Sequence, residues 1–147
     1  METRTLGNTG LEVSVLSFGG SSLGGAFGEV TQASADRAIG LALEAGINLF
    51  DTAPHYGVTK AETVLGLALQ NHPRDSYLLS SKCGQYGPGN FDFSAERVTR
   101  SVEESLQRLR TDHLDLIFCH DIEFVDIQSI VDVTLPALFK LKEQGKV

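Results

Sequence analysis

Four short apolar segments of this chain are each followed, after a turn, by a stretch of helical periodicity. The apolar segments are too short for amphipathic helices and are typical of buried strands; they cover residues 13–18, 47–50, 77–81 and 114–119. The helical stretches begin at about residues 34, 59, 94 and 135. Repeated strand–helix units predict an α/β fold with a parallel sheet and right-handed crossovers.

Local signals refine the ends of these elements. Residues 3–6 and 11–13 flank Gly7-Asn8-Thr9-Gly10, which predicts a β-hairpin at the N-terminus. The helix from Thr59 is predicted to begin with a capping box, in which Thr59 accepts from the backbone N–H of Glu62 and the Glu62 carboxylate reaches back. Ser94 is the predicted N-cap of the next helix.

Four such units are half of what a (β/α)8 TIM barrel needs, since that fold has eight strands and about 250 residues. Lys146 and Val147 follow the last helix where a fifth strand would begin. An open parallel sheet also leaves unpaired edges, which complete proteins avoid. We therefore expect residues 1–147 to form one incomplete domain, the N-terminal half of a barrel preceded by a hairpin, with strands five to eight absent.

Composition narrows the class of protein. A hydrophobic content of 41% and a charged content of 21% are typical of a globular protein, and no apolar run approaches the roughly 20 residues that span a bilayer. Twelve basic against 19 acidic residues argue against nucleic acid or an anionic membrane as partner. The N-terminus does not resemble a secretory signal, and the two cysteines have no paired spacing, so we expect a cytoplasmic, reduced protein.

Polar residues follow the predicted strands at their C-terminal ends. Asp51 ends the second strand, Tyr56 lies five residues later, and Lys82 and His120 directly follow the third and fourth strands. Active sites of parallel α/β barrels are assembled from residues at this end. An ammonium group favours the charged form of a nearby phenol, and a carboxylate can hold that ammonium in place. The four residues therefore predict an acid–base site. A positioned general acid or base typically contributes roughly 10²- to 10⁴-fold in rate.

Three of these residues also have an ordinary structural interpretation. Asp51 could bond turn amides, Tyr56 could pack on the surface, and His120 could be a core histidine. A zinc site could be drawn from His55, Cys83, Cys119 and His120, but these come singly from different loops, so no metal is expected. The four acid–base candidates, by contrast, all lie at or just after three successive strand ends, and this joint placement favours the acid–base site.

The glycine-rich segment 19–25 lacks the Gly-Lys-Ser ending of a phosphate loop and does not fit the dinucleotide fingerprint. Glycine lets a backbone approach a neighbour closely, so its expected role is close contact with a bound ligand.

The segment FDTAPHYG at 50–57, with Ser81-Lys82-Cys83 and Cys119-His120, resembles the aldo-keto reductases. The resemblance runs from Thr3 to Val147. It implies a (β/α)8 barrel enzyme in which Asp51, Tyr56, Lys82 and His120 form the catalytic tetrad, with Tyr56 as general acid/base. It also implies cofactor contacts from Gly20, Ser21 and Asp51.

Segments 80–84, 91–98 and 119–124 are similar to family members that oxidise L-galactose. The resemblance implies oxidation of this sugar at its anomeric carbon to a lactone on the route to ascorbate, with NAD as hydride acceptor and NADP as the alternative. Other aldose or pyridoxal dehydrogenases and reductases of the family stay open, as does a truncated, non-catalytic product that binds a partner.

Most cofactor contacts of the family follow strands five to eight. We therefore expect little or no dehydrogenase activity from this polypeptide alone. Cys83 and Cys119 lie beside Lys82 and His120, and oxidation of either is expected to impair activity.

Overall fold

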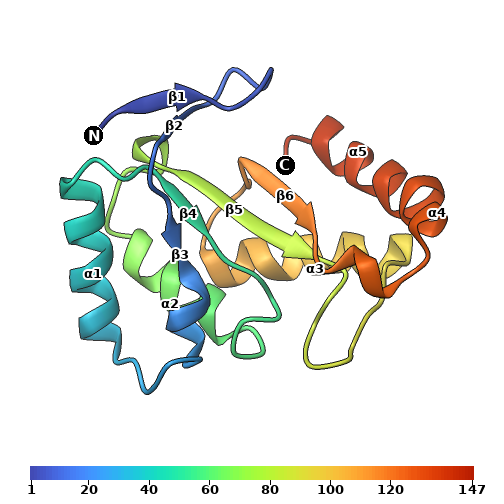
Figure 1. The fold of residues 1–147 in the computed structure, drawn as a ribbon, viewed down its shortest axis with the longest axis horizontal. Helices are drawn as coiled ribbons and strands as arrows, with labels where there is room; N and C mark the ends of the chain where they lie inside the picture. The colour runs from blue at the N-terminus through green and yellow to red at the C-terminus, as the bar shows by residue number, and fades with distance from the viewer.

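A four-stranded parallel sheet forms the centre of the computed structural model, which describes residues 1–147 (Figure 1). Its strands lie in chain order, so each one pairs with the next along the sequence; they are β3 (Phe18–Gly19), β4 (Leu49–Asp51), β5 (Leu78–Cys83) and β6 (Leu116–Cys119). Every pairing is parallel. The predicted α/β class and the parallel sheet are confirmed.

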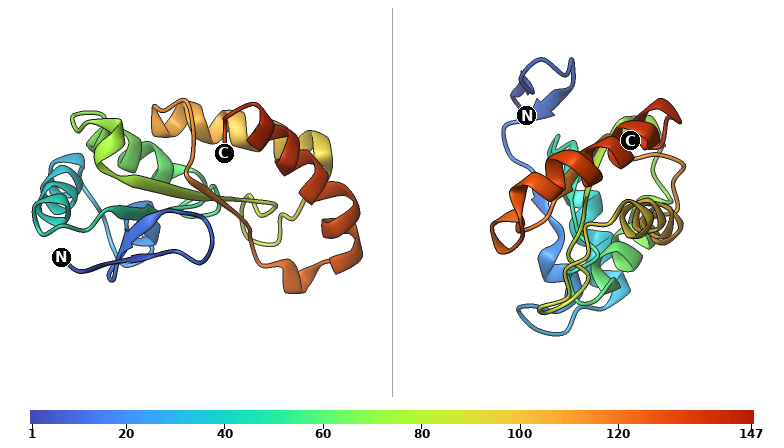
Figure 2. Two further views of the ribbon diagram at one scale, coloured as in Figure 1. Left: turned by 90° about the horizontal axis from the view of Figure 1, so that it is seen from above. Right: turned by 90° about the vertical axis from the view of Figure 1, so that its right-hand side faces the viewer.

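Helices connect the strands and cover one face of the sheet; they are α1 (Gln32–Glu44), α2 (Lys60–Leu69), α3 (Ala95–Leu109) and α5 (Leu135–Glu143). Helices α2 and α3 lie behind the sheet in the view of Figure 1, and Figure 2 shows the same layering from two other directions. Alternate strand residues such as Phe50 and Leu79 point towards these helices and are fully buried. This layer between sheet and helices is the core.

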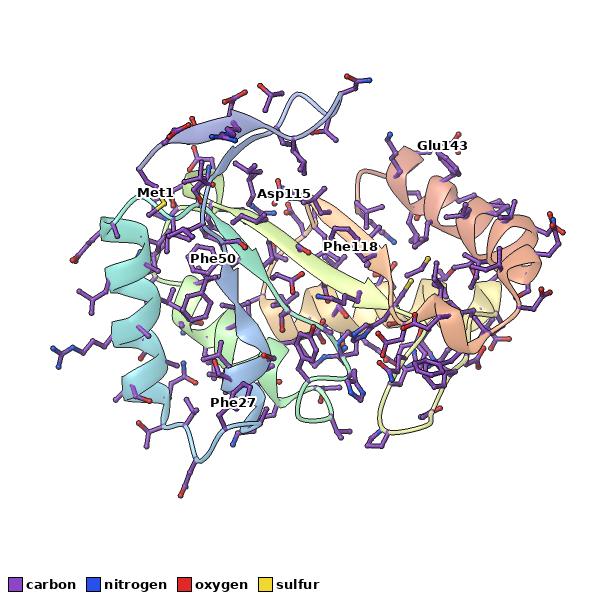
Figure 3. All side chains as sticks on the ribbon, viewed as in Figure 1. Met1, Phe27, Phe50, Asp115, Phe118 and Glu143 are labelled. Carbon is purple, nitrogen blue, oxygen red and sulfur yellow. The ribbon has the colours of Figure 1, made fainter.

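The opposite face of the sheet is more open. Phe118 of β6 stands in register with Lys82 of β5 and is 50% exposed, although it belongs to a sheet strand (Figure 3). The backbone N–H of Leu114 donates to the carbonyl oxygen of Lys146 at 3.0 Å, so the chain after α5 runs beside the start of β6. None of the helices is long and apolar enough to cross a membrane.

The N-terminal hairpin pairs β1 (Thr3–Thr5) with β2 (Glu12–Ser14), as predicted. The single strand predicted at 13–18 is wrong, because this segment is divided between the hairpin and β3. The backbone N–H of Ser14 donates to the Asn48 side chain at 2.8 Å, and the Ser14 hydroxyl donates to the Leu16 carbonyl. These bonds turn the chain after Ser14 and leave Val15 and Leu16 exposed.

Of the two predicted helix N-termini, one is confirmed and the other is wrong. Ser94 accepts from the backbone N–H of Arg97 at 3.3 Å and caps α3 as predicted. The capping box at Thr59 is wrong: Thr59 has a φ of 74° and caps nothing with its side chain. The Glu62 side chain is instead buried in the core, where Ser81 and Arg108 bind its carboxylate.

Short helical segments also occur between the predicted strands and helices. They are η1 (Gly20–Gly24), η2 (Arg74–Ser76), η3 (Ile122–Phe124), α4 (Ile127–Ser129) and the π-helical η4 (Ile130–Thr134). Of these, η1 and η3 follow strands of the sheet at their carboxyl ends.

Candidate acid–base site

Asp51 and Lys82 form a close ion pair at the carboxyl ends of β4 and β5. Lys82 Nζ lies 2.7 and 2.6 Å from the two carboxylate oxygens of Asp51 and donates to the Thr52 carbonyl at 2.9 Å. The Ser80 hydroxyl donates to Asp51 at 2.8 Å. Asp51 pairs in register with Ser80, and strand alternation places Ser80 and Lys82 on the same face. The ammonium is thereby fixed in position by three acceptor atoms.

Tyr56 lies against this pair, in the loop between β4 and α2. Lys82 Nζ is 5.0 Å from the centre of the Tyr56 ring. The ring of His120 lies perpendicular to it, with the two centres 5.6 Å apart. The structure therefore brings together all four residues that the sequence singled out, and the Tyr56 hydroxyl has no hydrogen-bond partner within the chain.

His120 follows β6, where its backbone N–H donates to the Cys83 carbonyl at 2.9 Å. Its side chain is only 10% exposed, and its Nδ1 is buried without a hydrogen-bond partner. Burial lowers the pKa of His120; Asp121 and Asp51 raise it, and Lys82 and His55 lower it further. The net lowering makes a neutral imidazole the prevailing form at neutral pH, which can donate and accept a hydrogen bond.

His55 belongs to the same cluster, although the sequence suggested for it only a role in zinc binding. Its ring centre lies 5.6 Å from that of His120 and 6.2 Å from that of Tyr56. Its position directly before Tyr56 was the one signal that could have indicated this. No three His, Cys, Asp or Glu side chains of the chain are arranged to hold a metal ion. Cys83 and Cys119 face the helices, on the other side of the sheet.

The glycine-rich segment packs directly on the loop that carries Tyr56. A β-carbon at Gly24 would lie 2.7 Å from the Gly57 nitrogen and 2.8 Å from the Tyr56 carbonyl carbon. One at Gly20, which is buried, would lie 2.7 Å from the Asp51 oxygen. Gly20 and Gly24 are therefore needed because the backbones of η1 and of the segment 51–57 lie in direct contact. The sequence analysis had expected these glycines to contact a ligand. Ser21 stays partly exposed beside them.

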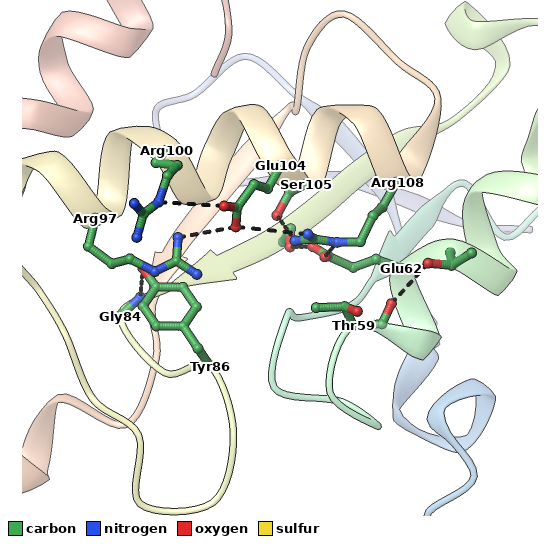
Figure 4. A network of polar contacts seen from close by, with 11 residues as sticks. Thr59, Glu62, Gly84, Tyr86, Arg97, Arg100, Glu104, Ser105 and Arg108 are labelled. Carbon is green, nitrogen blue, oxygen red and sulfur yellow. Dashed lines mark hydrogen bonds and ion pairs between the residues drawn. The ribbon is translucent and has the colours of Figure 1, made fainter.

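Behind the site, a buried ionic network fixes β5 to the helices (Figure 4). Glu62 of α2 accepts from the Ser81 hydroxyl at 2.6 Å and from Arg108 Nε of α3 at 2.7 Å. Arg108 also donates to the Ser105 hydroxyl at 3.2 Å. Ser81 directly precedes Lys82, so this network holds the strand that presents the ammonium.

The acid–base cluster is largely buried, yet it does not line a cavity: the side chains of Lys82 and His120 are 13% and 10% exposed. None of the cavities of the chain is lined by Asp51, Tyr56, Lys82 or His120. The largest cavity, about 580 Å³, lies between α2, α3 and the turn before β5, and its lining includes Gln70, Tyr77 and Arg110. The residues present supply proton-transfer groups and the hydrogen-bond partners that hold them in place.

Fold and site together define an α/β protein with an acid–base cluster at the carboxyl ends of its parallel strands. Residues 15–147 match the sequence model of the Aldo/keto reductase family. The chain belongs to this family.

Two curated relatives indicate the kinds of enzyme that share this sequence. L-galactose dehydrogenase of Arabidopsis thaliana is 51% identical over 148 residues, which cover 99% of this chain and 46% of the relative. D-threo-aldose 1-dehydrogenase of a Pseudomonas species is 31% identical over 94% of this chain and 49% of its own length. The chain spans about half the length of these relatives.

Solved structures agree on the fold. The holo form of an aldo-keto reductase from Bacillus halodurans superposes with a TM-score of 0.86 at 33% identity, over 99% of this chain and 47% of that protein. An aldo-keto reductase from Klebsiella pneumoniae in complex with NADPH superposes with a TM-score of 0.80 at 28% identity, over 99% and 48%.

Proposed function

We propose that residues 1–147 form the acid–base half of an NAD(P)-dependent sugar dehydrogenase built on a (β/α)8 barrel. The observation that carries the proposal is the convergence of Tyr56, Lys82, Asp51 and His120 at one end of four parallel strands. The half-barrel is supported by the four-stranded sheet, by the half-exposed Phe118 and by the 46% share of the Arabidopsis relative that the chain spans.

In the proposed reaction, Tyr56 takes the proton from the anomeric hydroxyl of the sugar. The positive charge of Lys82 stabilises the tyrosine after it has lost its own proton, and Asp51 keeps Lys82 in place. His120, as a neutral imidazole, donates a hydrogen bond to the same sugar oxygen and orients it. A bound nicotinamide cofactor supplies the hydride acceptor.

The cofactor is proposed to contact Gly20, Ser21 and Asp51 on this chain. Ser21 is partly exposed and carries a hydroxyl that suits a polar ligand, and Asp51 lies at the same carboxyl end of the sheet. No cavity of this chain is lined by these residues, so we propose that the phosphates are held by residues outside this sequence. NAD is the proposed cofactor, with NADP as the alternative.

L-galactose is the proposed substrate, because the Arabidopsis relative at 51% identity is an L-galactose dehydrogenase. D-threo-aldoses are the second candidate, from the relative at 31% identity. A panel of L-galactose, D-threo-aldoses and pyridoxal, each with NAD and with NADP, separates these possibilities.

The decisive experiment co-expresses this chain with the C-terminal half of the Arabidopsis enzyme and follows reduction of the cofactor. We expect the assembly to oxidise L-galactose, the chain alone to show little or no turnover, and Tyr56→Phe to lower the rate by at least about 10²-fold. Tyr77→Phe is the matched control, since Tyr77 lies at the opposite end of β5 and should leave the rate unchanged. A folded assembly in which Tyr56→Phe retains the wild-type rate would refute the role of Tyr56.

A further inference from the structure

Cys83 and Cys119 occupy directly paired positions on neighbouring strands. They are partners in the parallel register of β5 and β6, and both are free thiols. Residues paired in this way have backbones about 4.8 Å apart. The Cα atoms of disulfide-bonded cysteines are typically about 4.4 to 6.8 Å apart, so this pairing brings the two residues within bonding range.

Both thiols also point to the same side of the sheet. Ser81 reaches Glu62 of α2, and Cys83, two residues further along β5, faces the same helix layer. Cys83 is fully buried in the core, and Cys119 packs against that core while remaining partly exposed. Lys82 and His120, the immediate neighbours of the two cysteines, belong to the acid–base cluster on the opposite side of the sheet.

We propose that Cys83 and Cys119 are a dithiol–disulfide redox site, which closes on exposure to hydrogen peroxide and cross-links the two strands that present Lys82 and His120. The proposal is independent of the proposed dehydrogenase activity, because it concerns only the covalent state of the two sulfur atoms.

The environments of the two thiols assign them different parts in the reaction. The pKa of Cys119 is lowered by a hydrogen bond with the Cys83 side chain, whereas this same contact and burial raise the pKa of Cys83. Cys119 is the more exposed of the two thiols and the one that peroxide reaches first, so we assign it as the attacking thiolate, which is the nucleophilic form. Cys83 stays protonated and is the resolving thiol, which attacks the oxidised Cys119 to form the disulfide.

The chemistry balances with one peroxide. The Cys119 thiolate attacks a peroxide oxygen, the O–O bond breaks, and hydroxide leaves, so that Cys119 becomes a sulfenic acid. The Cys83 sulfur then attacks the Cys119 sulfur, the S–O bond breaks, and the oxygen leaves as water with the Cys83 proton. Two thiols have lost two electrons and two protons, and the peroxide has become two water molecules.

The test treats the 147-residue chain with a small excess of hydrogen peroxide and measures its intact mass, its thiol content and its peptide map. We expect a monomer lighter by two hydrogen atoms, with both thiols lost, the Cys83 and Cys119 peptides joined, and full reversal by dithiothreitol. Accumulation of sulfinic acid on Cys119 with Cys83 still a thiol, or disulfides between two copies of the chain, would overturn the proposal.

Two variants separate the roles of the thiols. In Cys83→Ser, Cys119 should stop at the sulfenic acid and be trapped by dimedone, because its resolving partner is missing. In Cys119→Ser, the buried Cys83 should react at least about tenfold more slowly than Cys119 does in the wild type, because burial hinders access to the thiol. Equal rates for the two single variants would contradict the assignment of Cys119 as the attacking residue. The peptide map of the unmodified sequence tests the disulfide itself without any variant.

Discussion

Arg108 Nε of α3 lies 2.7 Å from a carboxylate oxygen of Glu62 on α2, and the Glu62 side chain is completely buried. The pair joins two helices on the outer face of the sheet, and the Ser81 hydroxyl ties it to β5. A buried charge is tolerated only while its partner and hydrogen bonds are in place. The strand that carries Lys82 thus rests on an ionic contact that the proposed chemistry does not use.

Replacing Arg108 should therefore destabilise the fold strongly. We expect Arg108→Met to lower the free energy of unfolding by about 3–5 kcal/mol, because it leaves the Glu62 carboxylate buried without its counter-charge. Urea denaturation followed by circular dichroism measures this. Arg100→Met is the matched control on the same helix: Arg100 is 60% exposed and pairs with Glu104 on the surface, so its loss should cost at most about 1 kcal/mol.

The double variant Glu62→Met with Arg108→Met should recover part of the loss, because no uncompensated charge remains in the core. A double variant less stable than Arg108→Met would show that losing the Glu62 carboxylate costs more stability than removing its unpaired charge recovers. It would then favour a role for the Ser81 bond.

Gly24 and Gly40 make a contrasting pair of glycines. Gly24→Ala should destabilise the chain by about 1–3 kcal/mol, because its β-carbon meets the backbone of Tyr56 and Gly57. Gly40 lies in α1 with nothing within 4 Å of a β-carbon, so Gly40→Ala should stabilise by about 0.5–1 kcal/mol. Urea denaturation of both variants measures the two effects. Equal stabilities would contradict the close packing of η1 on the Tyr56 loop.

The sheet and the cluster at its rim were predictable because their signals are local. The apolar segments that end at Asp51, Lys82 and His120 indicate strands, and parallel strands must present their carboxyl ends at one edge. Tyr56 could be placed at the same edge because it lies only five residues after Asp51 in the sequence. The placement of all four residues follows from the order of strands, which sequential strand–helix units determine.

Features that depend on distant partners were not predictable in the same way. Thr59 and Glu62 have the spacing of a capping box, but the Arg108 that binds Glu62 lies 46 residues later. Gly24 looked suited to a ligand, and the Gly57 backbone occupies the space instead. The segment 13–18 has a uniform apolar pattern, yet bonds between Ser14 and Asn48 divide it. In each case a tertiary contact overrode a local preference.

His120 should make the stability of the fold depend on pH. Burial lowers its pKa in the folded state below the value of about 6.5 that it has when unfolded. Between these two values the unfolded chain binds more protons, so the free energy of unfolding should fall as the pH drops below about 6.5, by at most about 1.4 kcal/mol per pH unit for this group. Below the folded pKa the loss from this group should level off.

Urea denaturation at pH 7.5 and pH 5.5 measures this effect in the wild type and in His120→Asn. The variant should lose less stability between the two values, because the group that resists protonation is gone. His72→Asn is the control, since His72 lies in the turn after α2, remote from Lys82, Asp51 and His55, and it should keep the wild-type difference. If His120→Asn lost as much stability between pH 7.5 and pH 5.5 as the wild type does, water or a neighbouring carboxylate would be accommodating the charged imidazole. The surroundings of His120 would then not enforce the neutral form that the proposed reaction assigns to it.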